Sequence, residues 1–265
     1  MQKSVSKLIY NNLANGVSIL GVLPLCMLFL GDGSQYLIPL IIYNNVMDDL
    51  DGVLASKLNI KSEFGAILDN VCDAVSHIVF VMFIAIQFGG VLEAFGFVTI
   101  AVLIAGLVAA SSVVLRIVSR LLPASATGTG SPTNELVRHL LLVVLLTRLY
   151  EFNQGPVLMT VLLFHAVSML VPFRLPFLIR SLTKSATAIG LLNVALVVAW
   201  LIPVALPFIT LCFVGSYLYS FASGYLEWLR NHQTEPVVQS SALEAQPAVL
   251  GSNSTGNSEE KQVQP

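Results

Sequence analysis

Long apolar segments occupy most of the 265-residue chain and limit what it can fold into. A helix needs about 20 predominantly apolar residues to cross a bilayer core. The sequence contains eight segments of this kind, at residues 16–31, 35–56, 64–88, 92–118, 134–150, 156–178, 186–203 and 205–226. Because backbone groups in lipid must be satisfied within the spanning element, these segments predict an all-α, polytopic transmembrane helical bundle of about 8 spans, and of at least 6.

The composition agrees with a membrane protein and excludes other classes. Apolar residues make up 55% of the chain and charged residues 11%, whereas soluble domains carry about 25% charged residues. A net charge of −2 gives no electrostatic footprint for nucleic-acid binding. The three cysteines are odd in number and stand in apolar stretches, which argues against a disulfide framework.

The lysines and arginines predict the orientation of the bundle. If the N-terminus is cytoplasmic and the chain crosses eight times, every one of the 13 lysines and arginines except Arg148 falls in a cytoplasmic loop or tail. Cytoplasmic loops of membrane proteins are enriched in these residues. We therefore expect a multi-pass protein of the inner, cytoplasmic membrane, with both termini in the cytoplasm.

Three regions follow from this organisation. Residues 1–15 place Val5, Leu8, Ile9 and Leu13 on one face, which predicts an interfacial amphipathic helix. Residues 16–230 form the predicted transmembrane domain. Residues 231–265 are polar with few large apolar side chains, which predicts a disordered tail.

Five aspartates lie between residues 46 and 73, at the end of one apolar segment and the start of the next. Asp48 and Asp51 are three residues apart, and Asp69 and Asp73 are four apart, so each pair shares one face of a helix. The connection between the two segments is short. We therefore predict a helical hairpin that directs four carboxylates to one point near the cytoplasmic membrane surface.

Four clustered carboxylates repel one another, and burial adds a desolvation cost. Hard divalent cations with oxygen ligands, Mg²⁺ or Mn²⁺, resolve this conflict. A pair of such ions can also hold a diphosphate and neutralise a leaving group. Gly52, Ala55 and Gly65 lie on the same faces, where small residues allow a substrate to approach the backbone.

The spacing Asp48-x2-Asp51-Gly52-x2-Ala55-Ser56-x8-Gly65-x3-Asp69-x3-Asp73 resembles the signature of the CDP-alcohol phosphotransferase family. Seven of its eight fixed positions match, and Ser56 stands where the family has arginine. The motif covers about 26 residues, and the rest of the chain resembles the family only in its transmembrane helices.

The resemblance implies a role for each matching position. Asp48, Asp51 and Asp69 would hold the metal ions, and Asp73 would contribute to the second ion and act as general base. The nucleotide would lie against Gly52, Ala55, Ser56 and Gly65.

The resemblance implies an integral membrane enzyme of phospholipid biosynthesis, and a homodimer. It would transfer a phosphatidyl group from CDP-diacylglycerol to a polar alcohol and release CMP. Eight spans favour a branch like the phosphatidylserine and phosphatidylcholine synthases. Arg116 and Arg120, four residues apart, and Lys57 are candidates for contacts with the acceptor or a phosphate; the alternative is that they only anchor the cytoplasmic membrane surface.

Three other functions are consistent with parts of the sequence. The first is the reverse arrangement, in which CDP-choline or CDP-ethanolamine reacts with diacylglycerol. The second is the prenyltransferase superfamily that includes the ubiquinone-pathway enzymes, since Asn44-x3-Asp48-x2-Asp51 fits its first motif; there, however, the two aspartate motifs lie far apart. The third is a non-catalytic nucleotide-binding or transport protein. A transporter would spread acidic residues over several spans, whereas here they cluster at one hairpin.

Overall fold

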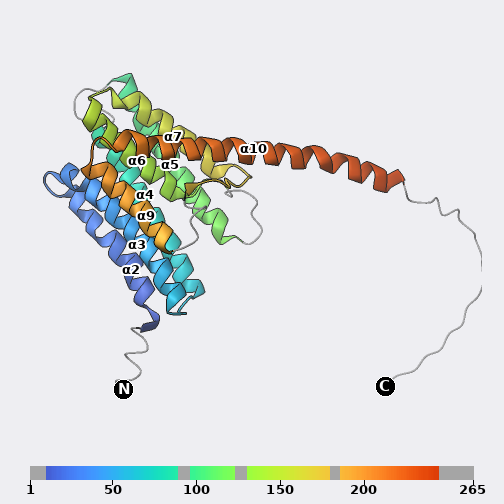
Figure 1. Cartoon of the computed structure of the whole chain (residues 1–265), viewed down its shortest axis with the longest axis horizontal. Helices are drawn as coiled ribbons and strands as arrows, with labels where there is room; N and C mark the ends of the chain where they lie inside the picture. The colour runs from blue at the N-terminus through green and yellow to red at the C-terminus, as the bar shows by residue number, and fades with distance from the viewer. Residues whose placement is uncertain (1–9, 89–95, 123–129, 180–185, 245–265) are drawn as a thin grey trace, which may run out of the picture. The chain divides into compact units, whose positions relative to one another are not determined.

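The computed structural model describes residues 10–88, 96–122, 130–179 and 186–244, and within them the chain is helical without a strand (Figure 1). This confirms the predicted all-α class. The helices are α2 (Leu13–Val22), α3 (Leu37–Lys57), α4 (Glu63–Phe88), α5 (Phe97–Leu121), α6 (Thr133–Tyr150), α7 (Gln154–Leu170), α9 (Ala186–Leu201) and α10 (Leu206–Glu244), with 3₁₀ segments η1 (Leu23–Phe29) and η2 (Gly33–Tyr36).

Three helical segments are long and apolar enough to cross a membrane: Glu63–Phe88, Phe97–Leu121 and Leu206–His232. Shorter apolar helices occupy Leu13–Phe29, Gln154–Leu170 and Ile189–Leu201. These segments indicate an integral membrane protein. The count of eight spans and the side on which the termini lie stay predictions.

Prolines explain where two helices differ from the predicted segments. Helix α7 ends at Leu170 rather than at residue 178, because Pro172 disfavours a helical conformation at Val171, which is extended (φ −61°, ψ 147°). In the first segment, α2 gives way at Val22 to the 3₁₀ segment η1, which has Pro24 in its first turn.

A left-handed turn ends α3 and begins the return toward α4. Asn59 has φ 54°, a conformation that asparagine tolerates better than most residues. The Ile60 N–H donates to the Ala55 carbonyl at 3.1 Å, and the Asn59 N–H donates to the Ser56 carbonyl at 3.4 Å. This pair of bonds is a Schellman motif, and it makes the connection to Glu63 short enough for the predicted hairpin.

Helix α6 lies at the centre of the core. Every side chain from Thr133 to Leu145 is buried, and the helix contacts α3, α4, α7 and α9. Helix α5 packs along α4 and α7. On α5, Gly106 faces Ala85 of α4 so closely that an added Cβ would lie 2.9 Å from the Ala85 Cβ. The bundle therefore holds α3 and α4 between several packed partners.

The chain divides into two compact units, residues 1–225 and 226–265. Helix α10 continues through residue 231, where we expect the polar tail to begin, and ends at Glu244. Leu226, Glu227 and Leu229 have high helix propensity, which favours continuation of α10 up to residue 231. Residues 1–9 of the predicted interfacial helix, and residues 245–265 of the predicted tail, lie outside the described residues.

Candidate metal and nucleotide site

Helices α3 and α4 bring three of the four predicted carboxylates together. One oxygen each from Asp48, Asp51 and Asp69 lies within 4.8 Å of the other two. Asp51 is buried, and the other two are half-buried. Asp73 is not part of this group and lies one turn further along α4, because a spacing of four residues advances the helix by about 6 Å.

The donor set fits a divalent cation. Three carboxylates at this separation repel one another unless a positive charge lies among them. The group contains only carboxylate oxygens and no histidine or cysteine. Oxygen donors suit Mg²⁺ or Mn²⁺, whereas zinc sites are built mainly from histidine and cysteine.

Hydrogen-bond donors from three other helices hold the carboxylates of α3. The side chain of Asn134 (α6) donates to Asp48 Oδ2 at 2.5 Å, and that of Asn193 (α9) donates to Asp49 Oδ2 at 2.7 Å. The Ser18 hydroxyl (α2) donates to Asp51 Oδ2. The asparagines stand 86 and 144 residues from their acceptors, so sequence analysis missed them, and no local pattern identifies them.

A cavity of about 290 Å³ lies beside the carboxylates, between α2, the end of α3 and the start of α4. Its lining comprises Ala14, Asn15, Ser18, Asp51, Gly52, Ala55, Ile60, Lys61, Ser62, Gly65, Ala66 and Asp69. An added Cβ on Gly52 would meet no atom within 4 Å, whereas one on Gly65 would lie 2.9 Å from Asn15 Oδ1. Gly52 thus leaves open space for a ligand, whereas Gly65 allows Asn15 to pack closely against α4.

The cavity includes most of the predicted nucleotide residues. Gly52, Ala55 and Gly65 line it, but Ser56 and Lys57 are exposed and are not part of its lining. Lys61, which the sequence analysis did not select, contributes a cation to the wall. The Schellman turn explains why Lys61 lines the cavity and Ser56 and Lys57 do not. It redirects the chain after Ala55 and brings the linker back over the cavity.

Arg116 and Arg120 lie on α5 near the same end of the bundle. Arg120 Nη1 donates to Asn70 Oδ1 at 3.5 Å, beside Asp69 on α4. Arg116 is 5% exposed, its Nη1 donates to the Met169 carbonyl at 3.4 Å, and its Nε has no hydrogen-bond partner. Among the described residues, Arg116 forms no ion pair. A buried guanidinium without a carboxylate is costly, which favours an anionic ligand at this position.

A second group of polar side chains is buried between α6, α7 and α10. The rings of His139 and His165 have centroids 4.9 Å apart, and the Tyr217 hydroxyl is 3.1 Å from His165 Nδ1. Tyr217 also hydrogen-bonds to Ser168. His165 is therefore a buried polar contact within the bundle. Sequence analysis missed Tyr217 and Ser168, which look like ordinary residues of apolar segments.

Comparison with known proteins places the whole arrangement in one family. The family model described as CDP-alcohol phosphatidyltransferase matches residues 11–214. The match includes the motif, all of α2 to α9 and the beginning of α10. No curated protein matches the chain. Because the matched region exceeds half of the chain and contains the clustered carboxylates, this protein belongs to the CDP-alcohol phosphatidyltransferase family, whose members are transferases that move a phosphatidyl group from a CDP-alcohol to an acceptor.

Proposed function

We propose that this protein transfers the phosphatidyl group of CDP-diacylglycerol to a polar alcohol and releases CMP, in a reaction that depends on a divalent metal. One observation carries the proposal. The carboxylates of Asp48, Asp51 and Asp69 converge, and two of them form part of the wall of a cavity that also includes Gly52 and Gly65. A charged diphosphate and a flat nucleotide ring need such a combination of metal ligands and bare backbone.

The cavity supports binding of the nucleotide part of the donor. Gly52, Ala55 and Gly65 expose their backbone to it, so a ring or phosphate can lie close to the helices. Lys61 offers a positive charge from the linker. We propose that Lys61 takes part of the role that the family signature gives to the arginine at position 56.

Asp48, Asp51 and Asp69 would hold Mg²⁺ or Mn²⁺, with two ions as the expected number. When bound, the metal neutralises the negative charge of the diphosphate and of the departing phosphate. Ser18 and Asn134 hold the carboxylates of Asp51 and Asp48 in place for this purpose.

Asp73 would act as the general base. It lies one turn beyond Asp69 on the same face of α4, so it would approach the site from the membrane side. Its carboxylate would accept the proton of the acceptor hydroxyl. The acceptor oxygen forms a bond to the phosphorus next to the lipid, and the bond from that phosphorus to the bridging oxygen breaks. CMP leaves with the electron pair.

Arg116 and Arg120 would bind an anionic group of the acceptor, or the phosphate of the lipid. The buried guanidinium of Arg116 forms no ion pair with a carboxylate of the described residues, and Arg120 contacts Asn70, the neighbour of Asp69 in sequence. We further propose that the site faces the cytoplasm of an inner membrane, where CDP-diacylglycerol would reach it from the bilayer and the polar alcohol and CMP would exchange with the cytoplasm. A homodimer stays a prediction.

Release of CMP by the purified, full-length protein in detergent tests the proposal. The assay contains CDP-diacylglycerol, Mg²⁺ or Mn²⁺, and in turn serine, choline, inositol, inositol phosphate or glycerol 3-phosphate. We expect release that requires one of these alcohols, stops with EDTA and is lost in Asp73→Asn. If the protein releases no CMP with any of the five alcohols but releases CMP from CDP-choline and diacylglycerol, it catalyses the reverse arrangement, in which diacylglycerol is the acceptor. Silence with both donors, although CDP-diacylglycerol binds, contradicts a catalytic function.

A further inference from the structure

The opposite end of the bundle contains a pocket that the proposed reaction does not use. Its volume is about 250 Å³. On α6, Arg148 in this pocket lies 14 residues beyond Asn134, the donor to Asp48, or about 21 Å along the helix axis at about 1.5 Å per residue. The pocket is lined by Ile38, Leu145, Arg148, Leu149, Ala199, Trp200, Pro203 and Leu206.

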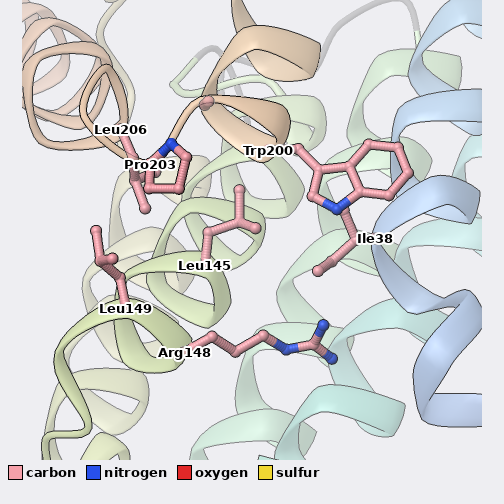
Figure 2. Close-up of a pocket in the computed structure, with 8 residues that line it drawn as sticks. Ile38, Leu145, Arg148, Leu149, Trp200, Pro203 and Leu206 are labelled. Atoms are coloured by element: carbon pink, nitrogen blue, oxygen red, sulfur yellow. The ribbon is translucent and has the colours of Figure 1, made fainter.

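The ends of α6 and α9 and the starts of α3 and α10 form this pocket, with Ile38 in the first turn of α3. Arg148 lies in the last turn of α6, Trp200 lies next to the end of α9, and Leu206 begins α10. Figure 2 shows the Arg148 side chain extended along one side of the pocket, with its guanidinium on the side of Ile38 and Trp200. Seven of the eight lining residues are apolar, so the arginine is the one charged group on otherwise apolar walls.

The guanidinium of Arg148 is available to an external anion. Arg148 takes no part in the ion pair between Arg138 and Glu135, and in the described part of the chain it forms no ion pair of its own. The acidic residue nearest to it in sequence is Glu151, which is exposed and lies just beyond the end of α6. None of the lining residues is acidic.

We propose that this pocket binds an anionic phospholipid, with the lipid phosphate on Arg148 and an acyl chain along Leu145, Leu149 and Leu206. Guanidinium groups match the geometry of phosphate oxygens with two parallel hydrogen bonds. Tryptophan is enriched where membrane meets water, which is the depth that a lipid headgroup occupies. A zwitterionic headgroup would bring an ammonium or choline group into a pocket without a carboxylate, so the pocket favours a headgroup of net negative charge.

With the predicted topology, the pocket would lie in the leaflet opposite the carboxylates, and the proposal does not depend on the proposed catalytic function. Arg148 is also the single basic residue that the predicted topology places on that side of the membrane. A lipid held there would brace the ends of α6 and α9 against the start of α10.

Lipid retention by the full-length protein tests this site. Native mass spectrometry of the detergent-purified protein, titrated with phosphatidylglycerol or with phosphatidylethanolamine, gives the number of bound lipids and their dissociation constants. We expect one phosphatidylglycerol to bind more tightly than the rest and than phosphatidylethanolamine. Arg148→Gln is expected to weaken that one binding event about tenfold, the effect of losing a charge-assisted hydrogen bond.

Two further variants test whether the change in lipid affinity is specific to this pocket. Arg174→Gln removes an exposed arginine elsewhere and should leave the tight site unchanged. Trp200→Leu keeps the charge but alters the wall, and should weaken binding on its own even if Arg148→Gln proves unstable. Equal affinity for the two lipids, or unchanged retention in both pocket variants, overturns the proposal, because the lipid would then be a non-specific annular lipid.

Discussion

At the scale of single residues, the carboxylates of α3 depend on donors from other helices. Asn134 donates to Asp48, Asn193 to Asp49 and Ser18 to Asp51. A hydrogen bond to one oxygen of a carboxylate sets the direction in which the other oxygen points. Partners of this kind commonly determine the affinity of a metal site as much as the ligands themselves do.

Asn134→Ala is therefore expected to weaken metal binding about 10- to 100-fold, because Asp48 loses the donor that orients it. Electron paramagnetic resonance of Mn²⁺ titrated into the purified protein measures this affinity without any turnover. Thr147→Val is the matched control, since the Thr147 hydroxyl donates to the Val143 carbonyl of the same helix, near the far end of α6. An unchanged Mn²⁺ affinity in Asn134→Ala would show that Asp48 needs no such support.

Gly52 offers a sharper test of the nucleotide cavity. A Cβ at this position meets no protein atom within 4 Å, so Gly52→Ala should fold with unchanged or slightly raised stability. The same methyl group projects into the cavity and should raise the KM for CDP-diacylglycerol about tenfold or more, since a close backbone approach is lost.

Gly215→Ala on α10 is the control for that variant, because a Cβ there also meets no atom within 4 Å and lies away from the cavity. Initial rates over a range of donor concentrations, together with thermal unfolding, measure both quantities. Equal KM values in the two variants would place the nucleotide elsewhere.

At the scale of elements, α6 contains a buried ion pair in its first turns, and the arginine of that pair also bonds to α3. Arg138 Nη1 lies 3.0 Å from Glu135 Oε1, and both side chains are almost completely buried. Arg138 Nε also donates to Asn45 on α3 at 3.1 Å. The first turns of α6 are therefore bound to α3 at Asn45 as well as at Asp48, and the position of the carboxylate helix depends on α6.

Arg138→Met is expected to destabilise the protein by about 3–5 kcal/mol, because it leaves Glu135 buried without its partner. The double variant Glu135→Gln with Arg138→Met removes both charges and should recover most of this loss. Thermal or denaturant unfolding in the same detergent measures the difference. If the double variant is as unstable as the single one, the loss comes from the Asn45 contact rather than from the unpaired charge.

Helix boundaries show how local chemistry limits prediction at this scale. Pro172 ends α7 before the apolar run ends, and Asn59 in the left-handed conformation turns the chain after α3. Both signals are visible in the sequence, but the apolar pattern alone does not indicate them. The direction of Ser56 and Lys57 follows from this turn, so their exposure could not be deduced from their place in the motif.

At the scale of the whole molecule, the distribution of charge predicts the orientation in the membrane. The hairpin between α3 and α4 should face the cytoplasm, and the segment between η1 and α3 should face the other side. Single cysteines test this orientation in a variant from which Cys26, Cys72 and Cys212 have been removed. Gln35 and Glu63 are suitable positions, because both are exposed and they lie before and after α3.

We expect a membrane-impermeant maleimide to label Gln35→Cys in intact cells and Glu63→Cys only after permeabilisation. The reverse pattern would invert the topology and place the carboxylates outside the cell. Labelling of both positions in intact cells would mean that the chain between them does not cross the membrane.

The sequence alone determined the helical class, the hairpin and the convergence of three of the four predicted carboxylates, because these depend on apolar length and on spacings of three and four residues along one helix. It also identified Gly52, Ala55 and Gly65, which share the face of the aspartates. Only the tertiary structure decided which distant residues meet them. The donors to Asp48 and Asp49, the unpaired guanidinium of Arg116 and the pocket between Arg148 and Trp200 depend on how each helix is rotated and packed against its neighbours. The helical period places residues on a face, but the helix that packs against that face is determined by contacts between segments far apart in the chain.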